Sequence, residues 1–236
     1  MGRRSLDHRI QEKLWRQCLP TKTAPVRVKV CGITNIDDGV RAANLGASAL
    51  GFIFWPHSPR YVSPDLAASV VEATGPMTSA VGVFVDDTAA HIHQTVAAAK
   101  LDVVQLHGDE PTELIAALKV RVIRAVALGA SAPETPIELI PPNVTVLLDA
   151  HDPLKRGGSG QQVDWTEAAR WARERPVILS GGLRPDNVTA AIERVRPYGV
   201  DVSSGVEVEP GRKDAKKLEA FFEAVAAAQA VERVDD

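Results

Sequence analysis

Short apolar segments alternate along the chain with amphipathic segments of helical length, and the first pair sets the pattern. Valine occupies every second position from 26 to 30, which is typical of a buried strand and puts Lys29 and Cys31 together on its other face. Asn35 is a suitable capping residue for a helix that ends near Gly46. The chain therefore begins with a strand, a loop and a helix.

The same order recurs along the rest of the sequence. Further helices are expected after Ser63, after Thr88, after Pro111 and from about Asp214 to Ala228. The other expected strands are residues 49–55, 81–85, 102–107, 121–126, 144–148, 177–179 and 200–202.

Eight strands that alternate with helical segments match a (β/α)8 barrel, the TIM barrel, better than an open sheet. A doubly wound open sheet is the alternative fold. That fold usually carries a Gly-x-Gly-x-x-Gly turn after its first strand, and the Cys-Gly-Ile-Thr sequence at 31–34 is not such a turn. We therefore predict a single closed barrel.

The expected barrel covers residues 26–228 of the 236-residue chain. This length is close to the ~250 residues of one eight-fold barrel, although length alone would also allow two domains. Residues 1–25 are rich in Lys and Arg and are interpreted as an N-terminal extension with a short helix, with a transit peptide as the alternative. Residues 229–236 are expected to form a C-terminal tail.

Composition and charge exclude several classes of function. Hydrophobic residues make up 45% and charged residues 24% of the chain, as in ordinary globular proteins, and the net charge of −3 gives no reason to expect nucleic acid or an anionic membrane as partner. No apolar run approaches the ~18 residues of a membrane span. Cys18 and Cys31 belong to no Cys-x-x-Cys pair, which fits a reduced compartment, so we expect a cytoplasmic protein.

Polar residues stand at or just after the ends of the expected strands. In a barrel these positions share one rim, where barrel enzymes hold their active sites. A single such residue is adequately explained as a cap or as core filling, but six on one rim indicate a site. The six are Cys31, Arg60, His107, Asp149, Ser180 and Ser203.

Glycine and serine gather after the last three strands, where barrels commonly bind phosphate through backbone N–H groups. Each glycine pair alone is weak evidence, because turns use glycine for its backbone freedom. Their occurrence in three successive loops predicts a phosphate site, and the first of these loops, 157–160, is expected to act as a mobile flap. The predicted phosphate-binding residues are Gly158, Ser159, Gly181, Gly182, Ser203, Ser204 and Gly205.

Cys31 and Asp149 lie on strands one and six, on different sides of the predicted barrel mouth. A substrate between them would meet an acid on one side and a base on the other. The sequence leaves two plainer interpretations open, a buried hydrophobic thiol and a capping carboxylate. No His-x-x-x-His or Cys/His cluster occurs, so we expect no metal.

Two further arrangements concern the interior and the rim. Lys29 lies one layer below Cys31, and we expect it to pair with Asp201 of the neighbouring eighth strand. A catalytic triad of Ser180, His107 and Asp149 can be drawn, but no Gly-x-Ser-x-Gly elbow supports it.

Seven motifs, in order along the chain, closely resemble those of the phosphoribosylanthranilate isomerase family, and the resemblance covers residues 26 to about 228. The motifs are KVCGIT at 29–34, SPRYV at 58–62, VQLHG at 104–108, LLD at 147–149, GGSG at 157–160 with DW at 164–165, SGGL at 180–183 and DVSSGVE at 201–207. The resemblance implies a cofactor-free (β/α)8 isomerase of tryptophan biosynthesis. Such an enzyme converts N-(5-phosphoribosyl)anthranilate to 1-(2-carboxyphenylamino)-1-deoxyribulose 5-phosphate by an Amadori rearrangement.

The resemblance also implies roles for individual residues. Asp149 would be the general acid that protonates the ribose ring oxygen, and Cys31 the base that removes the C2 proton. Arg60 would contact the anthranilate carboxylate, and the loops after strands six to eight would hold the phosphate. The remaining substrate contacts expected on this basis are Gln105, His107 and Asp201.

Two other functions remain open. A related isomerase of an aminoimidazole sugar phosphate would be expected to hold two phosphates with repeated half-barrel motifs, whereas here the glycine and serine loops follow strands six to eight only. A barrel that binds a phosphorylated ligand without turnover would need neither Cys31 nor Asp149. The expected partner is a small phosphorylated aminosugar, and the protein is expected to be a monomer or homodimer.

Overall fold

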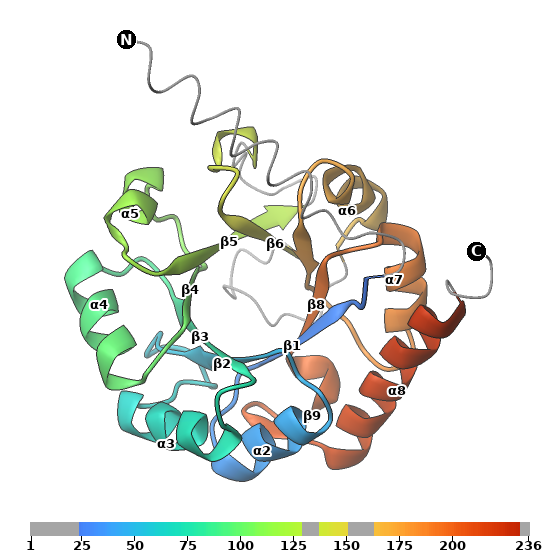
Figure 1. The fold of residues 1–236 in the computed structure, drawn as a ribbon, viewed down its shortest axis with the longest axis horizontal. Coiled ribbons are helices and arrows are strands. Elements are labelled where there is room, and N and C mark those ends of the chain that lie inside the picture. Colours follow the sequence, from blue (N-terminus) through green and yellow to red (C-terminus); the bar gives the residue numbers. More distant parts are fainter. Residues whose placement is uncertain (1–23, 129–136, 151–162, 232–236) are drawn as a thin grey trace.

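Eight parallel strands form a closed barrel surrounded by helices in the computed structural model (Figure 1). The structure describes residues 24–128, 137–150 and 163–231. Each strand pairs with the next one along the chain, and the eighth closes the ring by pairing with the first. The predicted (β/α)8 barrel is confirmed, and the open doubly wound sheet is wrong because the sheet has no free edge.

The strands and helices agree closely with those expected from the sequence, and α6 and α7 complete the alternation after the sixth and seventh strands. The barrel strands are β1 Arg27–Cys31, β2 Ala49–Ile53, β3 Ser79–Phe84, β4 Val103–Leu106, β5 Arg121–Leu128, β6 Thr145–Ala150, β7 Val177–Leu179 and β8 Gly199–Val202. The helices are α2 Ile36–Asn44, α3 Pro64–Thr74, α4 Ala89–Ala98, α5 Thr112–Ala117, α6 Trp165–Ala172, α7 Val188–Val195 and α8 Ala215–Val231, with 3₁₀ turns at Ile137–Leu139 and Ser204–Val206.

Three helices begin at the capping residues that the sequence indicated. The side chains of Asn35, Ser63 and Thr88 each accept a hydrogen bond from the backbone N–H three residues later, at the start of α2, α3 and α4. Each cap satisfies a donor that the helix itself leaves unpaired. The residues at which these three helices begin are therefore fixed by local chemistry.

Side chains along each strand alternate between the helix layer and the barrel interior. Residues such as Val30, Val104 and Val146 belong to the large core between strands and helices. A separate apolar cluster fills part of the interior, and it consists of Val81, Val103, Ile123, Leu147 and Ile178. Polar residues follow on the same inward face two residues after Leu147, Val103 and Ile178.

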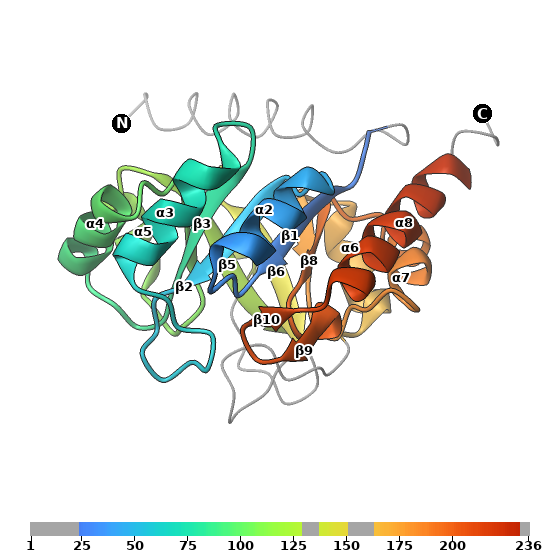
Figure 2. The ribbon, with the colours of Figure 1, turned by 90° about the horizontal axis from the view of Figure 1, so that it is seen from below.

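A small hairpin between β8 and α8 was not expected from the sequence. Its strands are β9 Glu207–Glu209 and β10 Arg212–Lys213, and they pair antiparallel. Gly211 turns the chain between them with a φ of +84°, which glycine adopts without strain. Figure 2 shows the hairpin at the end of the barrel where the parallel strands terminate. It therefore stands beside the predicted site.

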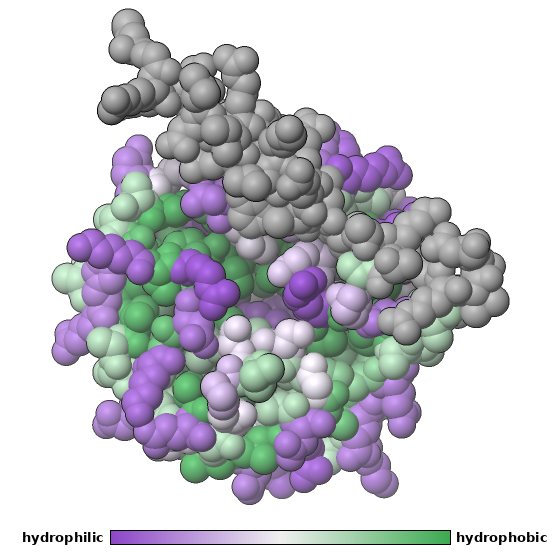
Figure 3. Space-filling view, viewed as in Figure 1, coloured by the Kyte–Doolittle hydropathy of each residue, from purple (hydrophilic) through white to green (hydrophobic). Residues whose placement is uncertain are grey.

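The outer surface is mixed in character. On the face shown in Figure 3, strongly hydrophilic residues gather around the periphery, over the helix layer, with more hydrophobic patches between them. Among residues 24–128, 137–150 and 163–231, no helix has both the length and the apolar character needed to cross a membrane. The short helix expected in residues 1–25 lies outside the described residues.

Candidate active site

Most of the polar residues predicted to share one rim come from strands spread around the barrel. Cys31 is the last residue of β1, and Asp149 is the second-last residue of β6. The residues that directly follow β4, β7 and β8 are His107, Ser180 and Ser203. Cys31 and Asp149 are each only 7% exposed. The closed ring brings these side chains together at one mouth although they are up to 172 positions apart in sequence.

A buried ion pair lies below this mouth. The ammonium of Lys29 is 2.8 Å from Oδ1 of Asp201, and β1 and β8 pair these two residues directly. This confirms the predicted pairing. Ser180 donates its hydroxyl hydrogen bond to the other oxygen of Asp201, at 3.4 Å, so the Ser180 hydroxyl is directed at Asp201 rather than at a histidine. The role of Asp201 as a substrate contact stays a prediction.

Lys29 also faces the thiol of Cys31. A Cβ atom at Gly51 would lie 2.7 Å from the Cys31 Sγ and 3.1 Å from the Lys29 Nζ, so both groups border the same small space above that glycine. Burial raises the pKa of the Cys31 thiol above its ordinary value, and the positive charge of Lys29 opposes that increase. Burial would lower the pKa of Lys29, but the Asp201 carboxylate and Cys31 outweigh it, and the pKa lies above its usual value. The lysine therefore remains an ammonium beside the thiol.

A second set of polar contacts approaches Asp149 from β4. The Gln105 amide nitrogen lies 2.9 Å from Nδ1 of His107, and the other ring nitrogen of His107 lies 3.4 Å from Oδ2 of Asp149. With the amide donating to Nδ1, the proton of a neutral His107 is on Nε2 and faces the carboxylate. The amide oxygen of Gln105 is buried without a hydrogen-bond partner in the described part of the chain. These contacts hold Asp149 on the opposite side of the mouth from β1.

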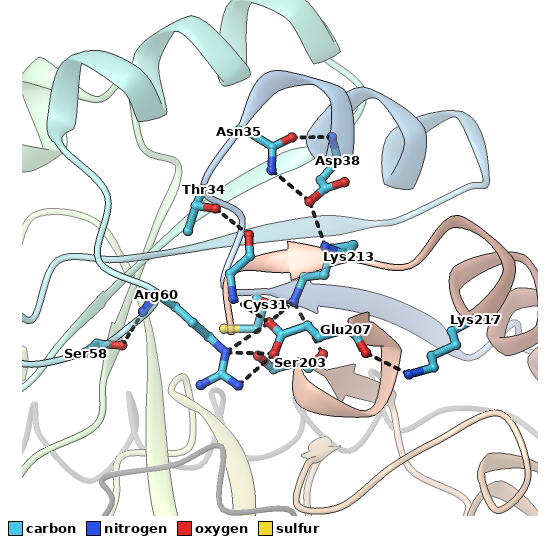
Figure 4. Close-up of polar contacts among 11 residues, drawn as sticks. Cys31, Thr34, Asn35, Asp38, Ser58, Arg60, Ser203, Glu207, Lys213 and Lys217 are labelled. Carbon is cyan, nitrogen blue, oxygen red and sulfur yellow. Dashed lines mark hydrogen bonds and ion pairs between the residues drawn. The ribbon is translucent and has the colours of Figure 1, made fainter. Parts of the chain in front are cut away.

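Arg60, in the loop after β2, is buried against the hairpin. Its Nε lies 2.9 Å and 3.1 Å from the two carboxylate oxygens of Glu207, and one terminal nitrogen lies 2.7 Å from Oε2. Lys213 binds the same carboxylate at 2.8 Å and also donates to the backbone oxygen of Cys31 at 2.6 Å (Figure 4). Neither Glu207 nor Lys213 was predicted as a site residue, because the only signal in the sequence was the presence of Glu207 in one of the family-like motifs.

The loops after β7 and β8 lie against each other. Gly181 and Gly182 have φ angles of +82° and +64°, and a Cβ atom at Gly205 would overlap the backbone oxygen of Leu183. The hydroxyl of Ser203 is buried and lacks a hydrogen-bond partner among the described residues. Two predicted phosphate loops therefore meet with an unused donor beside them. Gly158 and Ser159, from the third loop, lie outside the described residues.

The two histidines of α4, two positions apart in sequence, each have a partner among the described residues. His91 pairs with Asp87 at 2.6 Å, and the His93 ring accepts from the backbone of Lys119 at 3.5 Å. In the described ranges, no three His, Cys, Asp or Glu side chains gather in a way that could hold a metal ion.

Comparison with known proteins gives one consistent family. The model of the family described as N-(5'-phosphoribosyl)anthranilate (PRA) isomerase matches residues 28–224. The enzyme of that name from Geobacter metallireducens is 46% identical over 198 residues, which cover 84% of this chain and 97% of the relative.

Solved structures agree with the sequence comparison. The crystal structure of phosphoribosyl anthranilate isomerase from Thermus thermophilus has a TM-score of 0.78 and 40% identity, covering 86% of this chain and 99% of that one. A structure of such an isomerase in complex with reduced 1-(o-carboxyphenylamino)-1-deoxyribulose 5-phosphate has a TM-score of 0.74 and 39% identity, with the same coverage of both chains.

Proposed function

Because the chain belongs to the N-(5'-phosphoribosyl)anthranilate isomerase family, we propose that its rim site carries out that isomerisation, a step of tryptophan biosynthesis. The observation that carries the proposal is the presence of a thiol and a carboxyl group, Cys31 and Asp149, at one mouth of the barrel. A site that only bound a ligand would have no use for this acid and base. The alternative of a non-catalytic phosphate-binding barrel is therefore disfavoured.

The reaction needs an acid first. Asp149, in its protonated form, gives its proton to the ribose ring oxygen while the bond from that oxygen to C1 breaks. The lone pair of the anthranilate nitrogen forms the new C1–N double bond, so the product of this step is an open-chain Schiff base. The contact of His107 with Asp149 supports this role, because it holds the carboxyl group in one orientation.

The second step needs a base on the other side. The Cys31 thiolate takes the proton from C2, and the electrons of the C2–H bond form a C1–C2 double bond as the Schiff base nitrogen is neutralised. Tautomerisation of the resulting enolamine gives the 2-ketone of the product. Lys29 supports the assignment of Cys31 because its ammonium stabilises the thiolate that the step requires.

Binding would hold the reacting carbons between these two groups. We assign the substrate phosphate to the loops of Gly181, Gly182, Ser203, Ser204 and Gly205, with the loop of Gly158 and Ser159 covering it. We assign the aryl carboxylate to Arg60, and further contacts to Gln105, His107 and Asp201. Anchoring both ends of the substrate supplies binding energy that orients C1 and C2.

The remaining expectations follow from the same assignment. The substrate is a small phosphorylated aminosugar, the protein acts as a monomer or homodimer without a nucleic-acid or membrane partner, and it works in the cytoplasm. Residues 26–228 form the catalytic barrel, with residues 1–25 as an accessory extension. The helix α8 continues to Val231, so residues 229–231 belong to this helix and not to the tail expected at 229–236.

The test is to incubate the purified protein with freshly prepared N-(5-phosphoribosyl)anthranilate and to measure the anthranilate fluorescence over time. We expect fluorescence to fall at a rate proportional to protein concentration. An aminoimidazole sugar phosphate, offered in parallel, should not be isomerised. Binding of the anthranilate substrate without loss of fluorescence would contradict the proposal and favour the non-catalytic barrel.

A further inference from the structure

We propose that Glu207 is a positioning residue that orients the guanidinium of Arg60 for the aryl carboxylate of the substrate. The inference rests on the proposed function, because that substrate supplies the carboxylate. Glu207 belongs to the hairpin β9–β10 and lies 147 positions from Arg60 in sequence. Its role would be to fix the direction in which the Arg60 guanidinium presents its N–H donors to the carboxylate.

The geometry of the pair divides the guanidinium into two edges. Glu207 accepts from Nε and from one terminal nitrogen, so it occupies one edge of the planar group with three contacts of 2.7–3.1 Å. The other terminal nitrogen, Nη1, has no hydrogen-bond partner among the described residues. An arginine presents five N–H donors in a fixed fork, and two parallel donors on one edge match a carboxylate. The edge away from Glu207 is therefore available to a ligand carboxylate.

Arg60 is also held along its length. A Cβ atom at Gly32 would lie 2.6 Å from Cδ of Arg60, so the side chain crosses directly over the residue that follows Cys31. Gly32 has a φ of +75°, which is a second reason for glycine at that position. The arginine is thus fixed over the end of β1, beside the proposed base.

The carboxylate of Glu207 is itself anchored. Lys213 bridges Glu207, the backbone oxygen of Cys31 and, at 3.3 Å, the backbone oxygen of Ser203. The backbone N–H of Lys213 donates to Asp38 at 2.8 Å, and Lys217 donates to the backbone oxygen of Glu207 at 2.7 Å. Figure 4 shows these contacts joining the hairpin to the start of α2 and to the loop that carries Arg60. Glu207 is consequently held in one position and can in turn fix the orientation of the Arg60 guanidinium.

The carboxylate of Glu207 is charged in this cluster. Burial would raise the pKa of Glu207, but hydrogen bonds from Arg60 and the charge of Lys213 outweigh it and hold the pKa below its usual range. Glu207 is therefore ionised at neutral pH and lies between Arg60 and Lys213, while the Asp38 carboxylate accepts from the backbone N–H of Lys213. The N–H donors of Arg60 on the edge away from Glu207 are the ones left for an anionic ligand.

A second arginine–glutamate pair in the molecule provides a matched control. Arg124 and Glu110 form an ion pair that is as buried as the first, at 8% and 6% exposure. Glu110 uses its oxygens for the backbone N–H groups of Asp86 and Gly108, at 2.9 Å and 3.0 Å. Arg124 stands between Ile123 and Ala125, which face the barrel interior, so it points to the outer side of β5. This pair joins the loops after β3 and β4, and its hydrogen bonds go to residues other than Arg60 and Glu207.

The experiment compares two ligands on the intact protein by titration calorimetry. One is reduced 1-(o-carboxyphenylamino)-1-deoxyribulose 5-phosphate, and the other is the same molecule without its carboxyl group. Wild-type protein should bind the carboxylated ligand at least about tenfold more tightly, as expected for a charge-assisted bond. Arg60→Ala should abolish this preference.

In Glu207→Gln the preference should fall to about threefold or less, while affinity for the ligand without the carboxyl group stays within about twofold of wild type. KM for the substrate should rise more than kcat falls. Glu207→Asp keeps the charge beside Lys213 but withdraws it from Arg60, and it should show an intermediate preference, so it serves if the glutamine variant does not fold. Glu110→Gln should keep the full preference, whatever it costs in stability.

Equal weakening of both ligands in Glu207→Gln and Glu207→Asp would show a purely structural role and overturn the inference. An intact preference in these variants, with substrate still turned over by wild type, would overturn it as well. Failure of the proposed function is seen elsewhere in the experiment, as a wild-type protein that neither isomerises the substrate nor binds the carboxylated ligand.

Discussion

On β6, Leu147 and Asp149 both point into the barrel, two residues apart, and they belong to two different environments. Leu147 is fully buried in the inner apolar cluster with Val81, Val103 and Ile178. Asp149 stands one step higher, at the mouth, within reach of His107. The alternation of side chains that places Leu147 in the apolar interior therefore also places Asp149 at the polar rim.

The two halves of the interior differ in what maintains them. The lower half is stabilised by apolar burial, which needs only volume and shape. The rim contains ionisable groups that are costly to bury unless they are paired, and Lys29 and Asp201 form such a pair next to the rim. Substitutions at the rim should therefore affect the reaction, and substitutions below it should affect stability.

The largest expected effect at the rim is that of Asp149→Asn. Asparagine keeps the shape of the side chain but cannot donate a proton as an acid, so kcat should fall by about 10²–10⁴-fold. The free energy of unfolding should change by less than about 1 kcal/mol. Steady-state kinetics and thermal unfolding on the same sample check both parts. Turnover near the wild-type rate would remove Asp149 from the mechanism.

Leu147→Ala tests the other half of the comparison. The lost methyl groups and the resulting cavity should lower the free energy of unfolding by about 2–5 kcal/mol. For a chain of this size the melting temperature should fall by roughly 4–20 °C. Below the transition, kcat should stay within about threefold of wild type. A hundredfold loss of kcat in a folded Leu147→Ala protein would mean that the two halves are not separable.

A smaller effect is expected in the pH dependence of kcat/KM, which tests the influence of Lys29 on the Cys31 thiol. A free thiol has a pKa of about 8.5, and burial raises the pKa of Cys31 further. The thiolate fraction of the free enzyme should therefore still increase about tenfold per pH unit between pH 7 and 8, and kcat/KM should rise with it over the pH range in which Asp149 still carries the proton that it donates. Lys29→Gln removes the opposing positive charge and should move this rise to higher pH. An unmoved profile would show that Lys29 does not act on the thiol.

The same pKa shift has a consequence for stability. The folded state holds the Cys31 proton more tightly than the unfolded chain does, so this group stabilises the fold at pH values below its ordinary pKa. That contribution is lost as pH rises through the pKa of the folded state. Denaturation midpoints measured from neutral to alkaline pH should show a decrease that Cys31→Ser lacks.

Much of the fold and part of the site could be predicted from the sequence. Strand positions and the caps at Asn35, Ser63 and Thr88 are local features, and they were correct. The pair of Lys29 and Asp201 could also be predicted, because a closed barrel makes its first and last strands neighbours. This contact between Lys29 and Asp201 follows from the topology of the barrel alone.

Glu207 and Lys213 could not be found in the same way. Their strands have only three and two residues, too few to show an alternating pattern, and their contacts with Arg60 and Cys31 join a hairpin to loops far away in sequence. No spacing rule connects such positions. Only the structure shows the hairpin, although Glu207 belongs to a motif that resembles one of the family's motifs.

The claim that the rim carries the chemistry is tested most directly by the turnover of Cys31→Ser, with Cys18→Ser as its internal control. Serine keeps the size and polarity of the side chain but replaces the thiol with a hydroxyl that ionises far less readily. Fluorescence-monitored conversion of N-(5-phosphoribosyl)anthranilate should be nearly abolished in Cys31→Ser, with stability within about 1 kcal/mol of wild type. Cys18→Ser should turn over at the wild-type rate. Wild-type kcat in Cys31→Ser would show that the thiol is only packing and would contradict the mechanism.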